Sequence, residues 1–174
     1  MLYVLGFERI AVVVGDLYFV NPRPEPGQEG AERGARLEVR LLERDELPGS
    51  IYSAQPIAIG RPLWRADLLE SVAGPPASFD RAHHHPAFTG WEPGRRHFDK
   101  ALSADPVAWV GARLSDLGGM LAQAGVSEVD ASDVSAAVPE ILEVLRRLLE
   151  RVWAGELAQT PTGGGVTSAR VGWL

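Results

Sequence analysis

The sequence predicts an α+β protein, with an antiparallel sheet of five or six strands in the N-terminal half and two amphipathic helices of the C-terminal half packed on it. Short runs of β-branched and aromatic residues alternate with turn residues in the first part of the chain, and apolar residues recur at helical spacing in the last part. The connections between the strand signals are too short for parallel crossovers. We therefore expect one domain over residues 1–158, which is β-rich over 1–75, an ordered histidine-rich loop over 76–103 and helical over 104–156, followed by a flexible tail over 159–174.

The first strand signals lie over residues 9–20, which read RIAVVVGDLYFV. The central Gly-Asp pair predicts a two-residue hairpin turn between two strands. Residues 21–34 are rich in proline and glycine and are expected to form an exposed loop. Residues 37–41 read LEVRL, an alternation that predicts a strand with one dry face and one solvated face.

Two further strands are expected over residues 50–59 and 62–72, because both segments contain strand formers and Gly60 and Pro62 separate them. The second segment also fits a helical stripe, but we prefer a strand. On that strand, Arg65 and Asp67 are expected to form a solvated ion pair.

Two helices follow. Asp105 and Pro106 match an N-cap followed by proline at the first helical position, and apolar residues then recur at three- and four-residue steps up to Gly125. The second helix is expected to have Pro139 near its start and to end before Gly155. The acidic, serine-containing residues 127–137 between the two helices predict a turn or a short helix.

Composition excludes several classes of protein. The chain has 45% hydrophobic residues and no cysteine, which argues against a disordered polymer and a disulfide scaffold. Seventeen basic residues against 23 acidic ones give a formal charge of −6, and the arginines are scattered. This distribution predicts no nucleic-acid partner and no membrane partner. Without an export signal or a long apolar run, we expect a cytoplasmic protein.

The chemistry is concentrated in residues 79–99, which contain all four histidines of the chain. The residue before a proline avoids the helical region, so His85, which precedes Pro86, should be extended. If its two neighbours share that conformation, His83 and His85 project from one face and His84 from the other. A His-x-His pair on a strand is suited to chelate a metal ion.

Three sets of candidate residues follow from this loop. A divalent transition metal would take its ligands from His83, His85, His97 and Asp99. Acid or base catalysis, with or without a metal, would use His83, His85, Glu92 and His97. An anionic metabolite or cofactor would be bound by Arg81, Arg95, Arg96 and Trp91. Cysteine is absent and no serine nucleophile motif occurs, so covalent catalysis is disfavoured.

We therefore expect a small-molecule site built on this loop, either metal-dependent or using histidine as acid and base, and acting on an anionic metabolite. Two alternatives remain open. The protein could be a non-catalytic binding or assembly protein, such as a homodimer with the loop as its interface. The polar groups of the loop could also simply hydrogen-bond one another and hold a structural coil.

Overall fold

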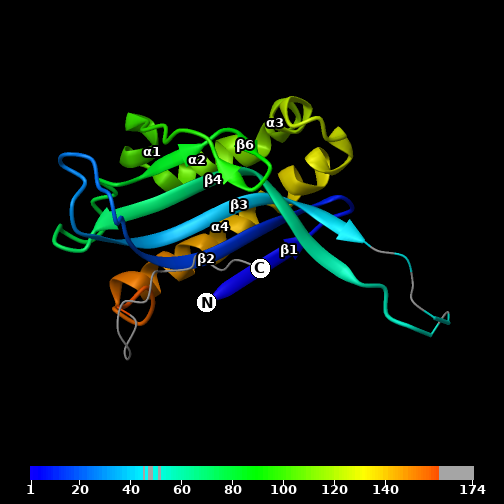
Figure 1. The fold of residues 1–174 in the computed structure, drawn as a ribbon, viewed down its shortest axis with the longest axis horizontal. Coiled ribbons are helices and arrows are strands. Elements are labelled where there is room, and N and C mark those ends of the chain that lie inside the picture. Colours follow the sequence, from blue (N-terminus) through cyan, green and yellow to red (C-terminus); the bar gives the residue numbers. More distant parts are fainter. Residues whose placement is uncertain (45, 47–48, 51, 161–174) are drawn as a thin grey trace.

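The computed structural model describes residues 1–44, 46, 49–50 and 52–160, and it confirms the α+β arrangement (Figure 1). Five antiparallel strands form one sheet in the order β1-β2-β3-β4-β5, so each strand pairs with the next one in the chain. They are β1 (Leu2–Gly6), β2 (Ile10–Val20), β3 (Ala31–Arg44), β4 (Ile57–Ser71) and β5 (His83–His85). Two short strands, β6 (Phe88–Thr89) and β7 (Glu92–Pro93), form a separate hairpin. Most of the predicted tail, residues 161–174, lies outside the described residues.

Within the described part of the chain, the helices cover one face of the sheet and leave the other face without a helical layer (Figure 1). They are α1 (Lys100–Ala104), α2 (Pro106–Ser115), α3 (Leu117–Gln123), the short 3-10 helix η1 (Glu128–Asp130) and α4 (Ala131–Trp153). The long helix α4 contacts α2 and lies across β2 and β3. Among the residues that the structure describes, no helix combines the length and the apolar character needed to cross a bilayer.

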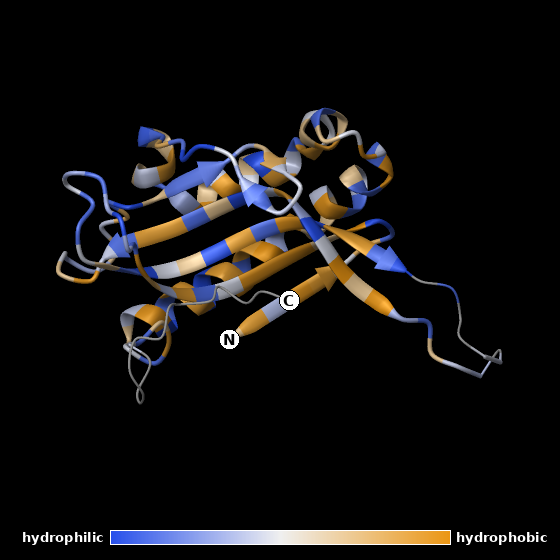
Figure 2. Cartoon of the chain, in the orientation of Figure 1, coloured by the Kyte–Doolittle hydropathy of each residue, from blue (hydrophilic) through white to orange (hydrophobic). Residues whose placement is uncertain are grey.

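The hydrophobic core lies between the sheet and the helices. Alternate residues of three strands are no more than 2% exposed and point toward the helices: Ile10, Val12, Val14, Leu37, Val39, Trp64, Ala66 and Leu68. They pack against the buried stripe of α4, of which Ile141, Leu145 and Leu148 are members. Full burial of a side chain of this size contributes about 1.5–3 kcal/mol. Figure 2 shows this alternation as hydrophobic and hydrophilic bands along the strands.

The predicted hairpin within residues 9–20 is wrong, because β2 runs straight through Gly15 and Asp16. Gly15 pairs with Leu2 on one side and with Arg36 on the other, so it lies inside the sheet. The Asp16 carboxylate accepts the backbone N–H of Ala158 at 2.9 Å and pairs with the N-terminal ammonium group. The strand that precedes β2 and pairs with it is β1, which we did not predict.

Two other glycine signals lie inside strands instead of at breaks between them. The predicted loop over 21–34 ends early, because β3 begins at Ala31 and includes Gly34. A Cβ atom on Gly34 would lie 2.0 Å from the carbonyl oxygen of Leu68, so this position of the strand accepts only glycine. The predicted break at Gly60 and Pro62 is a bulge within the single strand β4, where the pairing register with β3 shifts next to Arg40.

The helical half also differs in detail from the prediction. The Asp105 side chain caps α2 as predicted, accepting the N–H of Ala108 at 3.0 Å. The first predicted helix, however, is divided at Asp116 into α2 and α3. Residues 131–137 belong to α4, so Pro139 lies inside this helix and not near its start. Tertiary packing of the buried Val134 and Val138 outweighs the loss of one helical hydrogen bond.

The carboxylate of Asp130 ties the helical half to the sheet. It is 1% exposed and accepts the backbone N–H groups of Glu8, Arg9 and Ile10 at 3.1, 2.7 and 2.8 Å. Glu8 and Arg9 lie in the turn between β1 and β2, and Ile10 is the first residue of β2. The contact therefore holds that turn in place.

Substitution Asp130→Ala is expected to lower the free energy of unfolding by about 3 kcal/mol, because it leaves buried N–H donors without an acceptor. Denaturant unfolding followed by circular dichroism measures this. The matched control is Asp133→Ala, which removes an exposed carboxylate from the first turn of α4 and should cost no more than about 0.5 kcal/mol. Equal effects of the two substitutions would contradict the proposed tie.

Candidate functional site

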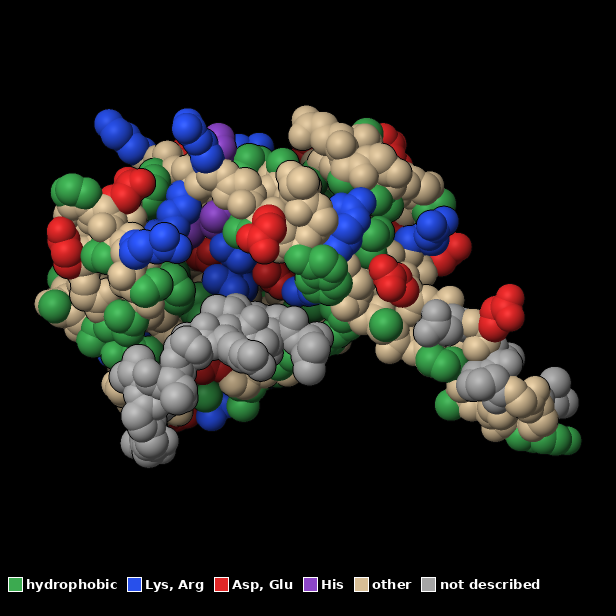
Figure 3. All heavy atoms as spheres, in the orientation of Figure 1, with side chains coloured by type: hydrophobic (Ala, Val, Ile, Leu, Met, Phe, Trp, Pro, Cys, Tyr) green, Lys and Arg blue, Asp and Glu red, His purple; other side chains and the backbone are tan. Residues whose placement is uncertain are grey.

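The face of the sheet opposite the helices carries a buried set of charged side chains. On β3 and β4, the residues that alternate with the core positions are Arg36, Glu38, Arg40, Arg65 and Asp67. Arg36 lies opposite Asp67 and Glu38 lies opposite Arg65, so opposite charges face each other across the two strands. Figure 3 shows basic, acidic and histidine side chains gathered on this face.

This face is not solvated, which overturns two predictions. Glu38 and Arg40 are each 6% exposed, although the alternation in residues 37–41 predicted a wet face. Asp67 is 1% exposed, so its pair with Arg65 is not a solvated surface pair. Both errors have the same cause: β5 and the β6–β7 hairpin lie beside and over these residues.

The strand β5 places two imidazole rings on this charged face. His83 lies opposite Asp67, and His85 lies opposite Arg65. Both histidines are buried, at 2% and 3% exposed. As the alternation of a strand predicts, His84 points to the other face, where its ring lies 4.9 Å from that of Trp109.

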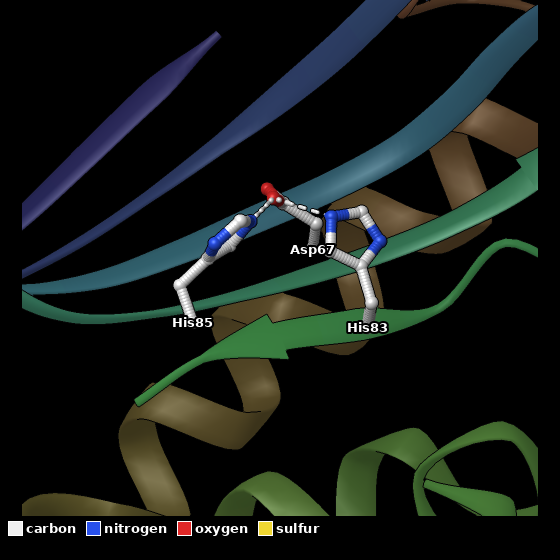
Figure 4. A group of neighbouring side chains, drawn as sticks. All are labelled: Asp67, His83 and His85. Carbon is white, nitrogen blue, oxygen red and sulfur yellow. Dashed lines mark ion pairs between the residues drawn. The ribbon is translucent and has the colours of Figure 1, made fainter. Parts of the chain in front are cut away.

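Asp67, His83 and His85 form a compact group, which we call the triad (Figure 4). The Asp67 carboxylate projects from β4 between the two rings. Its Oδ2 atom lies 3.3 Å from Nε2 of His83 and 3.6 Å from Nε2 of His85. One ligand atom from each of the three residues lies within 4.8 Å of the other two.

Backbone carbonyl groups set the orientation of both rings. The Nδ1–H of His83 donates to the carbonyl of Arg81, and the Nδ1–H of His85 donates to the carbonyl of Gly94, each at 2.8 Å. Each ring therefore turns its Nε2 atom toward Asp67. Burial, followed by the charge of Arg65, lowers the pKa of His85 to about 4, so this ring is neutral near pH 7.

Two arginines contact the Asp67 carboxylate. Arg36 donates its Nε–H to Oδ1 at 2.6 Å, and Nε of Arg65 forms an ion pair with Oδ2 at 2.9 Å. Arg65 also donates an Nη2–H to Nε2 of His85 at 2.9 Å. Burial opposes ionisation of Asp67, but Arg36, the contact with His83 and Arg65 together outweigh it and hold the pKa of this carboxyl well below its usual value. The triad therefore contains a fully ionised buried carboxylate.

A cavity of about 520 Å³ opens beside the triad. Its lining includes Asp67 and His83 of the triad, four arginines and three aromatic residues; the arginines are Arg36, Arg40, Arg65 and Arg96, and the aromatic residues are Phe19, Phe88 and Trp91. Three of the guanidinium groups lie over these rings, Arg40 at 5.2 Å from Trp91, Arg65 at 5.8 Å from Phe88 and Arg96 at 5.9 Å from Phe19. Some N–H groups of these arginines already contact protein acceptors: Arg40 donates to the Gly60 carbonyl and to Glu38, and Arg65 donates to His85.

Four other residues that the sequence predicted for the site line the cavity or contact a member of the triad, but do not belong to the triad. Arg96, Trp91 and Glu92 line the cavity, and Glu92 is exposed. Arg81 holds the loop that precedes β3, since its guanidinium group donates to the carbonyl groups of Gly27 and Glu29, and its own carbonyl orients His83.

The other three candidates lie outside the triad. His97 is exposed and exchanges two backbone hydrogen bonds with His84, which places it away from His83 and His85. Asp99 caps α1 by accepting the N–H of Ala101 at 2.8 Å, and it also accepts the indole N–H of Trp109 at 3.0 Å. Arg95 is exposed and lines a separate, smaller cavity.

The sequence reasoning missed Asp67 as a member of the site, together with the arginines of β3 and β4. A signal for them was present. Charged residues at every second position of 36–40 and of 65–67 mark one face of two strands that were expected to be close in the sheet. Opposite charges on adjacent strands indicate a built polar site more strongly than a solvated surface.

Comparisons with protein-family models, with curated protein sequences and with solved structures find no match to this chain.

Substitution Asp67→Ala is expected to lower the free energy of unfolding by about 3 kcal/mol, because it leaves the partly buried cations Arg36 and Arg65 without their carboxylate. Urea unfolding of the metal-free protein measures this. Glu92→Gln, which changes an exposed carboxylate of the same cavity, serves as the control and should stay within about 0.5 kcal/mol of the wild type. Wild-type stability of the Asp67→Ala protein would show that the buried charges do not depend on this residue.

Proposed function

We propose that this protein binds a divalent transition metal ion through Asp67, His83 and His85, and that it binds a small anionic molecule in the adjoining cavity. The observation that carries the proposal is the orientation of the two rings. Both imidazoles donate Nδ1–H to a backbone carbonyl and turn Nε2 toward one ionised carboxylate. Nε2 of His83 lies 3.3 Å from an oxygen of that carboxylate, so one cation can contact both atoms.

The spacing of the donor atoms supports a single ion. Two ligand atoms that each lie about 2.1 Å from one metal ion are about 3.0–3.4 Å apart when they occupy adjacent positions. The distances of 3.3 and 3.6 Å from the Asp67 oxygen to the two Nε2 atoms are close to this range. Hydrogen bonds from Nδ1 to backbone carbonyls are also the usual outer contacts of metal-ligating histidines.

Two histidines and one carboxylate leave coordination positions open. Such a set is typical of catalytic zinc and non-haem iron sites, in which water or substrate completes the coordination. An ion bound here could lower the pKa of a water molecule or polarise an oxygen of a ligand in the cavity.

The charge of the cavity favours an anionic ligand. Four arginines line it against three carboxylates, those of Glu38, Asp67 and Glu92. A divalent ion at the triad would add two positive charges. Guanidinium edges bind carboxylate or phosphate groups through paired hydrogen bonds, so an anion of that kind would balance the charge of the loaded site.

The contacts of the rings argue against metal-free acid or base catalysis. His83 uses Nδ1 for the Arg81 carbonyl and directs Nε2 to Asp67. His85 uses Nδ1 for the Gly94 carbonyl and Nε2 for Arg65. Neither ring keeps a nitrogen free to exchange a proton with a substrate, as general acid or base catalysis requires.

The test is metal analysis of protein produced without a histidine tag and equilibrated with Zn²⁺, Co²⁺ or Fe²⁺. We expect one ion per chain in the wild type, and an affinity at least about 100-fold lower after the paired substitution His83→Ala and His85→Ala, because two of the three ligands are lost. Elemental analysis gives the stoichiometry, and the absorption spectrum of bound Co²⁺ reports nitrogen and oxygen ligation.

His97→Ala is the matched control for this experiment. It removes an imidazole from the same segment of the chain, but His97 is exposed and lies outside the triad. Its metal affinity should equal that of the wild type. A wild-type protein that takes up none of the three ions, or a doubly substituted protein that keeps its metal, would overturn the proposed function.

A second candidate function is assembly of two copies through the histidine-rich segment. It is favoured by two aromatic side chains of that segment that are largely exposed, Trp91 at 57% and Phe98 at 53%. Exposed aromatic residues are common at the centres of protein interfaces.

If this segment forms a homodimer interface, replacing Trp91 and Phe98 with serine should shift the mass measured by light scattering from dimer to monomer. Substitution of the exposed Tyr52, which lies far from this segment in the chain, is the control and should leave the mass unchanged. A wild-type protein that is monomeric at high concentration would exclude this candidate.

A further inference from the structure

Arg65 bridges two of the three residues of the triad. Its Nε atom lies 2.9 Å from the Asp67 oxygen that faces both rings, and its Nη2–H donates to Nε2 of His85 at 2.9 Å. The guanidinium group therefore places a positive charge against the same two atoms that would ligate a metal ion. It is held there from β4, where Arg65 lies opposite His85.

We infer that Arg65 occupies the metal position in the metal-free protein, and that its displacement by the metal creates the binding group for the anion. This inference rests on the proposed function and names a regulation of the same site. Its basis is that Arg65 and a metal ion compete for the same nitrogen atom of His85. An imidazole nitrogen without a proton has one lone pair in the plane of the ring, which can accept a hydrogen bond from Arg65 or bind a metal ion, but not both.

The surroundings of Arg65 decide where the displaced group can go. Its side chain is 14% exposed and lines the cavity, with Phe88 on one side. A second carboxylate, that of Glu38, has its Oε1 atom 4.0 Å from Nη1 of Arg65. Glu38 already accepts a hydrogen bond of 2.6 Å from Arg40, and both of these side chains are buried.

A displaced Arg65 would thus share one carboxylate with Arg40 and would leave the cavity with an excess of positive charge. A buried cation without a full partner is costly, and an anion in the cavity would remove that cost. Metal binding should therefore strengthen anion binding. Because coupling of equilibrium affinities is reciprocal, the anion should strengthen metal binding by the same factor.

The experiment compares Co²⁺ binding in sodium sulfate and in sodium chloride of equal ionic strength, measured by calorimetry and by Co²⁺ absorption. Sulfate serves as the probe because it is a dianion that binds Co²⁺ weakly in solution. In the wild type, sulfate should tighten Co²⁺ binding about 5-fold or more. In Arg65→Met, Co²⁺ should bind about 5-fold or more tightly without sulfate, and the sulfate effect should fall below about 2-fold.

Two further variants support the comparison. Arg95→Met removes an exposed arginine that lies outside this cavity, and it should behave as the wild type does. Arg65→Gln keeps a hydrogen-bond donor without the charge, and it provides a second measurement if Arg65→Met unfolds below the working temperature. Thermal unfolding of each variant shows whether it is folded under the conditions of the titration.

The outcomes separate this inference from the proposed function. Co²⁺ binding by the wild type that sulfate and Arg65→Met both leave unchanged would overturn the inference and leave the metal site intact. Tighter binding in Arg65→Met without a sulfate effect in the wild type would support the competition and overturn the coupling. Co²⁺ binding by Arg65→Met and not by the wild type would overturn the proposed function, because the natural protein would then bind no metal at this site. Failure of every form to bind Co²⁺ would overturn both proposals.

Discussion

The burial of one ionised carboxylate, that of Asp67 in the middle of β4, is the constraint on which the open face of the sheet depends. A charge that is 1% exposed is tolerated only when other groups replace its lost hydration. Arg36, Arg65 and His83 do so, and they come from three neighbouring strands. The carboxylate therefore links β3, β4 and β5 by charge, in addition to the backbone hydrogen bonds of the sheet.

Stability alone is a weak reason for such an arrangement. Well-packed apolar residues often stabilise a protein as much as a buried ion network does, because the network first has to overcome the desolvation of every charge. The helical face of the same sheet shows that this chain can build an apolar core from the alternate positions of the same strands. Charged residues at alternate positions of β3 and β4 on the other face, beside a cavity lined by arginines, are better explained by a ligand that they bind.

The fold class was accessible from the sequence because it depends on local periods. Alternation predicted the strand that contains residues 37–41, and three- and four-residue steps predicted helices in the C-terminal half. Errors in the predicted strand boundaries arose where one residue type has two structural roles. Glycine permits a turn, but at Gly34 it permits the close approach of a neighbouring strand instead. Only the tertiary structure distinguishes these uses.

The candidate site was accessible only in part for a related reason. The alternation in residues 83–85 indicated which two histidines share a face, and this follows from a single strand. The identity of the carboxylate between them depends on which residue of β4 lies opposite β5, which no local pattern contains. His97 and Asp99 are near the pair in sequence, but the chain reverses direction between His84 and His97, and this places both residues elsewhere.

The register of β5 is therefore the decisive feature of the site, because a shift by one residue would reverse the face of every side chain in the strand. Such a shift would turn His84 toward Asp67 and would direct His83 and His85 into the core. Two features oppose it. The ring of His84 packs on the helical face beside the stacked rings of Trp64 and Trp109, at 6.5 and 4.9 Å, and the backbone of His84 is paired with His97. The helical core thus determines the register that brings two imidazoles to the carboxylate on the opposite face, which explains how so short a strand can supply two groups of a defined site.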